Sequence, residues 1–278
     1  IAAIFFFIFF AGWLSPFVFG LGYIWVDLFR PQEVSYFLIN RLPVSAIMAM
    51  GTLATYFLMD RQYPPKFYLT TFLLICLAIW ITMTMSWAVA PPKEVWKKWD
   101  WAFKAVLFGA FIPYLFRSRI QIEAFMLVYV LSIAGSLMAF GIKTMIAGGG
   151  YGHNLGLLKG NSGLAESSTL ALVAITVIPL ILFLNKHTEI IPRVRYRSLL
   201  FYGLVLAALM TAVGSFARTG LIATGILGVM TWWRFPHKFR NALIVLAALG
   251  IVLAVSTDKW ADRMSTITTF STETSAMS

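Results

Sequence analysis

Long apolar runs, separated by short polar segments, follow one another along most of the chain. A helical span needs about 20 mostly apolar residues, whereas a membrane-spanning strand needs alternating polarity, which these runs lack. The pattern therefore predicts an all-α, polytopic transmembrane helical bundle. Nine spans are predicted, at 3–26, 37–59, 67–89, 101–116, 120–146, 165–185, 197–216, 219–233 and 241–256.

The composition also favours a membrane location. Hydrophobic residues make up 60% of the chain and charged residues 12%, and the mean hydropathy is +0.82. A water-soluble protein of this size could not bury so much apolar side chain in its core. Because no linker or repeat separates the spans, we expect residues 1–256 to form one transmembrane domain. The Ser- and Thr-rich segment 257–278 is expected to begin a large periplasmic loop, cut short in a fragment of a longer protein.

The net charge of +11 is interpreted as a topology signal, and no nucleic-acid partner is expected. Lysines and arginines divide equally between the two predicted sides of the membrane, so their number does not decide the orientation. Two dense basic clusters, 193–197 and 234–240, lie beside span ends, as is typical of cytoplasmic loops. We therefore expect these clusters in the cytoplasm and Arg218 on the outward side.

Residues 91–104 are predicted to form a short helix that lies in the membrane interface. Trp96, Trp99 and Phe103 share one helical face, and four lysines lie mostly on the others. This pattern is typical of an aromatic anchor. Contact between the lysines and anionic lipid headgroups is the alternative.

Arg218 lies between two apolar runs. A single helix from Tyr196 to Trp233 would contain 38 residues and measure about 57 Å, nearly twice the thickness of the hydrocarbon layer. The chain must therefore turn near Gly214–Gly220, which places Arg218 at the outward tip of a helical hairpin. Two roles fit this position: an interfacial arginine that reaches lipid headgroups, or a guanidinium that binds phosphate oxygens in a cavity.

A second outward segment, 143–168, contains seven glycines. Glycine-rich backbone can direct several amide groups at one anion, and Lys143, His153 and Lys159 add side-chain donors. A flexible connector explains the same composition, because the spacing of a phosphate-binding loop is missing. Glu166 is expected in the first turn of the following helix.

The sequence also leads to predictions about metal binding, two histidines and the prolines inside the spans. No residues have metal-ligand or catalytic-triad spacing, so we expect no metal and no other cofactor. His187 and His237 lie in the basic loops and are expected to be solvated. Four prolines inside predicted spans are expected to kink their helices: Pro16, Pro43, Pro113 and Pro179.

Four segments, in order along nearly the whole chain, resemble the bacterial O-antigen ligase and polymerase superfamily, and in particular the O-glycosylation ligases associated with exosortase systems. They are YIWVDLFRPQEVSY (Tyr23–Tyr36), GGGYGHNLGLLKGNSGLAESSTLALVAI (Gly148–Ile175), GSFARTGLIA (Gly214–Ala223) and DRMSTITTF (Asp262–Phe270). The Arg-Thr-Gly hairpin followed by an aqueous loop is the most specific part of the resemblance.

The resemblance implies a glycosyltransferase in the bacterial inner membrane that needs neither a nucleotide sugar nor a metal. Such enzymes transfer a glycan from undecaprenyl pyrophosphate to an acceptor on the periplasmic side. The acceptor would be lipid A core, a protein or another glycan. Arg218 matches the hairpin arginine that binds the diphosphate and takes part in catalysis. Lys159 or Lys143 takes the place of the family's basic loop residue, and the histidine expected to act as base would lie beyond Ser278.

The sequence also allows other substrate-binding residues and two other functions. His153, Asn161 and Arg30 are further candidates for substrate binding. A polymerase of the same superfamily would share every motif quoted above. A lipid-linked oligosaccharide flippase or other transporter would also be polytopic, although the spans lack the internal repeat and intramembrane acids typical of coupled transporters.

Overall fold

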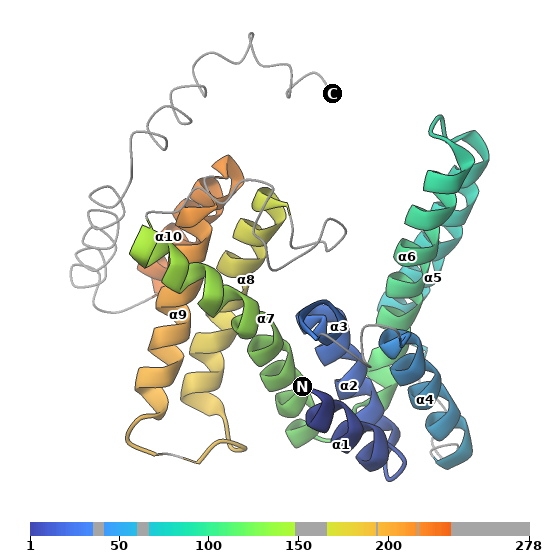
Figure 1. Cartoon of the computed structure of the whole chain (residues 1–278), viewed down its shortest axis with the longest axis horizontal. Coiled ribbons are helices and arrows are strands. Elements are labelled where there is room, and N and C mark those ends of the chain that lie inside the picture. The colour runs from blue at the N-terminus through green and yellow to red at the C-terminus, as the bar shows by residue number, and fades with distance from the viewer. Residues whose placement is uncertain (36–41, 60–66, 148–165, 193, 216, 235–278) are drawn as a thin grey trace. The chain divides into compact units, whose positions relative to one another are not determined.

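The computed structural model describes residues 1–35, 42–59, 67–147, 166–192, 194–215 and 217–234, and these form an all-α protein (Figure 1), as predicted. The α-helices are α1 (Ala2–Gly12), α2 (Pro16–Phe29), α3 (Pro31–Val34), α4 (Val44–Met59), α5 (Leu69–Thr84), α6 (Pro92–Phe111), α7 (Arg119–Ala147), α8 (Ser167–His187), α9 (Arg197–Gly214) and α10 (Arg218–Arg234). Two short 3-10 helices, η2 (Met85–Trp87) and η3 (Ile112–Leu115), follow α5 and α6.

By length and composition, four segments of the described chain could cross a membrane. They are Leu69–Trp87, Arg119–Ile146, Ser167–His187 and Arg197–Gly214, and shorter apolar helices accompany them. These segments indicate a multi-pass membrane protein, because a helix satisfies its own backbone hydrogen bonds where water is excluded. The predicted spans 120–146, 165–185, 197–216 and 219–233 match α7 to α10 within a few residues. The predicted span 241–256 lies outside the described residues.

The first predicted span, 3–26, is two helices in the structure. α1 ends at Gly12, and Ser15 has an extended backbone (φ −159°, ψ 130°) before Pro16 begins α2. A proline has no amide hydrogen and disfavours the helical conformation of the residue before it, so it starts a helix more readily than it continues one. α1 and α2 then pack against each other.

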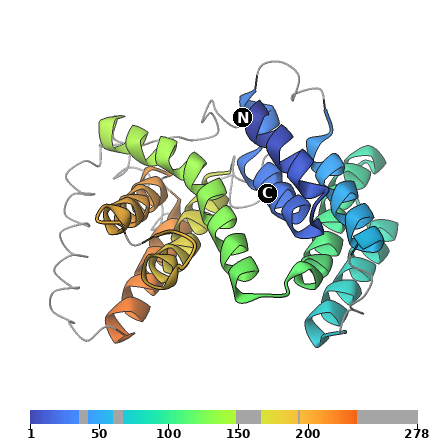
Figure 2. The ribbon, with the colours of Figure 1, turned by 90° about the horizontal axis from the view of Figure 1, so that it is seen from below.

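The interfacial helix predicted at 91–104 and the span predicted at 101–116 are joined in the structure. One helix, α6, runs from Pro92 to Phe111 and packs along α5 (Figure 2). Two contacts bridge the predicted junction: Lys104 pairs with Asp100 at 2.6 Å, and the ring of Trp99 stacks on Phe103 with centroids 4.9 Å apart. No glycine or proline interrupts the chain between Lys93 and Phe108, so the backbone continues as one helix.

Of the four prolines expected to kink a span, one lies in the interior of a described α-helix. This residue is Pro179, in α8. Pro16 is the first residue of α2, Pro43 precedes α4, and Pro113 lies in η3, directly after α6. Helix ends tolerate proline because the first amides of a helix have no partner within it.

The chain divides into two compact units, unit 1 (Ile1–Phe125) and unit 2 (Met126–Ser278). In unit 1, α2 packs against α1 and α4, and α5 packs against α6. The apolar core between α1, α2 and α4 is formed by Phe5, Phe19, Val26, Val44 and Met48, all of which are buried.

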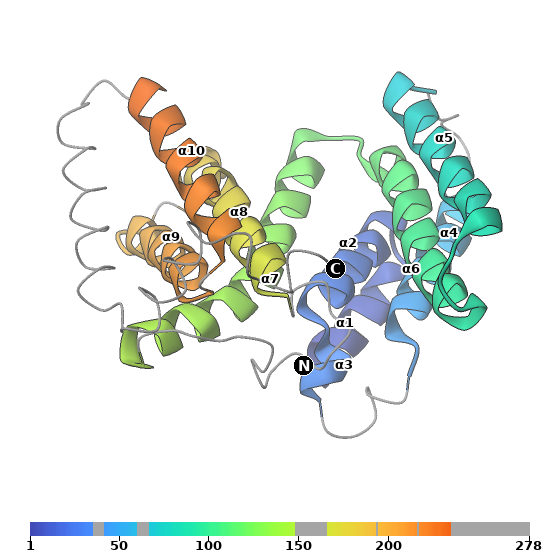
Figure 3. The same cartoon turned by 90° about the horizontal axis from the view of Figure 1, so that it is seen from above.

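In unit 2, α8 packs against α9 and α10, and α7 crosses α9 (Figure 3). The crossing is close because small residues face one another. A Cβ atom added at Gly141 of α7 would lie 2.5 Å from the carbonyl oxygen and 2.8 Å from the Cα of Ala207 of α9. Beside it, the buried Thr211 Oγ1 lies 2.8 Å from the carbonyl oxygen of Leu137 in α7. Such small-residue contacts are a common basis of helix association in membranes.

A Gly141→Ala variant is expected to lower stability by about 1–3 kcal/mol, because the added methyl group meets backbone that must move as a whole. Gly203→Ala in α9 is the matched control, since a Cβ there meets nothing within 4 Å. Thermal unfolding in detergent, followed by circular dichroism, would measure both. Equal melting temperatures for the two variants would contradict the close contact between α7 and α9.

Candidate functional site

The hairpin predicted around Gly214–Gly220 is present. α9 ends at Gly214 and α10 begins at Arg218. Ser215 holds the turn: its hydroxyl donates to the carbonyl oxygen of Ala212 at 2.7 Å and accepts from the amide of Ala217 at 3.2 Å. The turn therefore lies where the length of the apolar runs predicted it.

The hairpin tip is buried between two other helices. A Cβ atom added at Gly214 would overlap the side chain of Thr144 in the last turns of α7, and one added at Gly220 would lie 2.8 Å from the Cβ of Ala171 in α8. Ser215 is 2% exposed, which confirms that the turn is packed. The end of α7, the start of α8 and the tip of the α9–α10 hairpin therefore meet at one end of unit 2. We call this meeting point the tip site.

The tip site carries the positive ends of two helices. α8 starts at Ser167 and α10 at Arg218, and the contact between Gly220 and Ala171 brings the first turns of these helices together. Unpaired amide groups at a helix start attract anions. An arginine as the first residue of α10 adds a full positive charge where the helix dipole alone would favour an acid. The backbone arrangement therefore suits an anionic ligand.

Glu166 is an acid beside the start of α8. It lies at the N-cap position of α8, one residue earlier than the predicted first turn, and its side chain does not bond to a helix amide. Instead its carboxylate accepts hydrogen bonds from the hydroxyls of Ser168 and Thr169, the latter at 3.3 Å. The first amide groups of α8 are therefore not capped by this carboxylate.

The structure places only some of the predicted site residues. Lys143 is exposed on α7, one residue before Thr144, and Arg218 is the first residue of α10. Both residues therefore lie on helix ends that meet at the tip site, whereas their part in substrate binding stays a prediction. His153, Lys159 and Asn161 lie outside the described residues.

Arg30 belongs to unit 1, where it joins α2 to α3. Its backbone is left-handed (φ 50°, ψ 62°), and its amide donates to the carbonyl oxygen of Val26 at 3.1 Å. This conformation costs a residue other than glycine of order 1–3 kcal/mol. Arg30 therefore joins α2 to α3 within unit 1, and its place among the candidates for substrate binding stays a prediction.

Arg197 is a residue whose role the sequence did not reveal. It belongs to the basic cluster 193–197, yet it is 8% exposed, and its guanidinium donates to the carbonyl oxygens of Asn185 (2.5 Å), Ile191 (3.2 Å) and Thr188 (3.4 Å). These acceptors belong to the end of α8 and to the loop that follows it. Arg197 therefore satisfies carbonyl groups that α8 leaves unpaired at its negative end.

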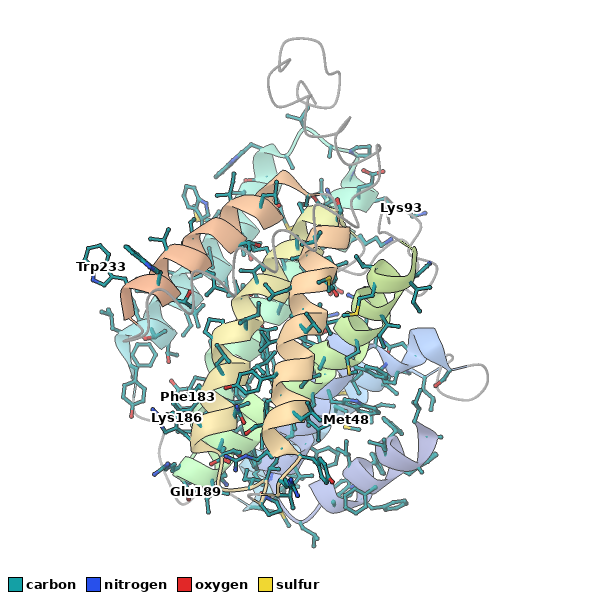
Figure 4. All side chains as sticks on the ribbon, turned by 90° about the vertical axis from the view of Figure 1, so that its left-hand side faces the viewer. Met48, Lys93, Phe183, Lys186, Glu189 and Trp233 are labelled. Atoms are coloured by element: carbon teal, nitrogen blue, oxygen red, sulfur yellow. The ribbon has the colours of Figure 1, made fainter. Side chains whose placement is uncertain are left out.

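The side chains that could bind a metal or transfer a proton are dispersed in the described part of the chain. No group of three His, Cys, Asp or Glu side chains that could hold a metal ion is found there. Cys76 is free and exposed. Phe183, Lys186 and Glu189 lie at the C-terminal end of α8 (Figure 4), where exposed His187 stacks on Phe183 with ring centroids 4.7 Å apart.

The helices and the tip site together define a multi-pass helical membrane protein with a positively polarised helix junction. The chain belongs to a family described as Family of unknown function (DUF5935), whose model matches residues 1–189. The match covers α1 to α8 and ends before the α9–α10 hairpin. No curated protein and no solved structure matches the chain.

Proposed function

We propose that the protein is an inner-membrane glycosyltransferase of the O-antigen ligase type. It would take a glycan from undecaprenyl diphosphate and transfer it to an acceptor hydroxyl at the periplasmic side of the membrane. The observation that carries this proposal is the tip site, where the first turns of α8 and α10 lie side by side, Arg218 is the first residue of α10 and Lys143 precedes Thr144 of α7. The resemblance of the Arg-Thr-Gly hairpin to the ligase superfamily supplies the substrate class.

The chemistry of the carrier fits a site at a helix junction near the membrane boundary. A polyprenyl diphosphate holds its tail among apolar helices and its charge at headgroup depth. Amide groups at helix starts and a cation at Arg218 are suitable partners for the diphosphate oxygens. Lys143 adds an ammonium group at the end of α7.

The transfer would proceed as a single displacement. The acceptor hydroxyl attacks the anomeric carbon while the bond from that carbon to the carrier phosphate oxygen breaks, so the configuration inverts. Negative charge grows on the departing diphosphate, and cations already in place stabilise it more in the transition state than in the ground state. The proton of the acceptor hydroxyl passes to a base, which we expect beyond Ser278.

A reconstitution experiment tests this function. The full-length protein, in vesicles, is given a synthetic polyprenyl diphosphate carrying a labelled glycan, together with lipid A core or an acceptor protein. Appearance of the labelled glycan on the acceptor supports a ligase, whereas growth of the lipid-linked glycan identifies a polymerase. Movement of the labelled lipid between leaflets without any transfer would overturn the assignment in favour of a flippase.

Neutralising Lys143 and Lys159 together is expected to weaken binding of the lipid-linked donor roughly tenfold or more, because a charge-assisted contact from either lysine to a phosphate contributes about 1.5–3 kcal/mol. Lys186→Gln is the matched control, since it removes an exposed positive charge at the opposite end of α8. Donor binding would be measured with labelled lipid in detergent. Equal affinity in the double variant and the control would remove both lysines from the site.

A further inference from the structure

The turn between α5 and α6, which belongs to unit 1, contains a pocket of about 320 Å³. It lies where the apolar span Leu69–Trp87 ends and the charged first half of α6 begins. The pocket is lined by Ile81, Thr84, Met85, Ala88, Ala90, Glu94, Val95, Lys98, Trp99 and Ala102.

One wall of this pocket is apolar and held in place by Trp99. The Trp99 indole donates from Nε1 to Thr82 Oγ1 at 3.1 Å, which ties α6 to α5, and its ring also stacks on Phe103. α5 leaves most of its surface open, with 11% of its span buried. The pocket therefore opens on a helix pair whose outer surface suits hydrocarbon.

The other wall carries two charges that are not paired with each other. Glu94 and Lys98 are four residues apart on α6, and neither side chain makes an ion pair or hydrogen bond within the described chain. The same spacing does give an ion pair at Asp100 and Lys104, with 2.6 Å between the charged atoms. Lys98 is thus available to a ligand in the pocket.

The surrounding charge is positive. Lys93 and Lys97 are exposed on the same half of α6, whereas Asp100 is neutralised by its partner Lys104. Glu94 is the one acid left in this half helix. Trp87 and Trp96, on either side of this turn in the sequence, are exposed, and tryptophan is enriched at headgroup depth.

We propose that this pocket binds one anionic phospholipid, with its phosphate on Lys98 and its first methylene groups against the apolar wall formed by α5 and Trp99. Three observations support this occupant. The excess positive charge complements an anionic headgroup, the pocket lies at the end of an apolar span, and its lining changes from charged to apolar residues, as a phospholipid does from head to tail. The site is independent of glycan transfer.

Native mass spectrometry of the full chain with phosphatidylglycerol and phosphatidylcholine tests the proposal. The wild-type protein is expected to retain phosphatidylglycerol preferentially, and Lys98→Gln to lower its affinity about fivefold, the effect of one basic residue at a membrane surface. Lys104→Gln makes the same charge change outside the pocket, where the lysine already has a partner. Equal losses in both variants would show diffuse surface attraction and overturn a defined site.

A second variant makes the test independent of any loss of folding. Glu94→Gln removes the acid that lines the pocket and should increase retention of phosphatidylglycerol, which a misfolded protein would not do. A decrease in retention would overturn the proposal. Preferential retention of phosphatidylethanolamine by the wild type, lost in Glu94→Gln, would likewise overturn it and identify a zwitterionic lipid that bridges Glu94 and Lys98.

Discussion

Glycan transfer is expected to fall roughly 10- to 100-fold in an Arg218→Lys variant of the full-length protein, although the charge is kept. A lysine ammonium cannot reproduce the planar pair of donors with which a guanidinium holds two phosphate oxygens. Because Arg218 begins α10 at the tip site, the loss should appear in the rate of transfer. Arg218→Ala should lower the rate at least as much. The measurement is the initial rate with a labelled lipid-linked donor at saturating acceptor.

The matched control for this prediction is Arg234→Lys, which makes the same exchange at the last residue of the same helix. It should leave transfer unchanged, and both variants should insert into the membrane and unfold at the temperature of the wild type. If Arg218 only reached lipid headgroups, its replacement by lysine would leave the rate of transfer nearly unchanged. Full activity in Arg218→Lys would therefore remove Arg218 from catalysis.

An Arg197→Met variant is expected to lose about 2–4 kcal/mol of stability, the largest effect that we predict outside the tip site. Methionine fills much of the same space but donates no hydrogen bond, so the carbonyl groups of Asn185, Thr188 and Ile191 lose their buried partner. Leaving a buried carbonyl group unpaired costs more free energy than its hydrogen bond contributed to stability. Thermal unfolding in detergent, followed by tryptophan fluorescence, would measure the change.

Arg195→Met provides the comparison within the same loop. Arg195 is exposed, so this change removes a similar charge and adds a similar apolar side chain without breaking contacts of the α8 end. Its melting temperature should stay within the error of the wild type. A loss of stability in Arg195→Met as large as in Arg197→Met would mean that the basic cluster acts through its total charge and not through the hydrogen bonds of one residue.

Much of the fold could be predicted from the sequence because a membrane leaves few choices. Apolar runs long enough to span a bilayer must form helices, and the helices α7 to α10 begin and end within a few residues of the predicted spans. The hairpin between α9 and α10 followed from length alone, since one helix through both runs would be too long to fit.

The local sequence predicted the first part of the chain less well. The run 3–26 is apolar throughout, so hydropathy gave no sign that α1 ends at Gly12 and α2 starts at Pro16. In α6, the change from charged to apolar residues suggested two helices, yet helix formation depends on backbone hydrogen bonds, which continue across such a change.

By itself, the sequence determined the class of protein, the helices of unit 2 and the position of the turn before Arg218. Only the tertiary structure showed that Gly214 and Gly220 contact α7 and α8, and that Arg197 is buried while Arg195 is exposed. The hydropathy of a segment follows from its own residues, whatever that segment packs against. Close contacts and buried hydrogen bonds depend on which helices meet and at which residues, and packing between distant segments decides that.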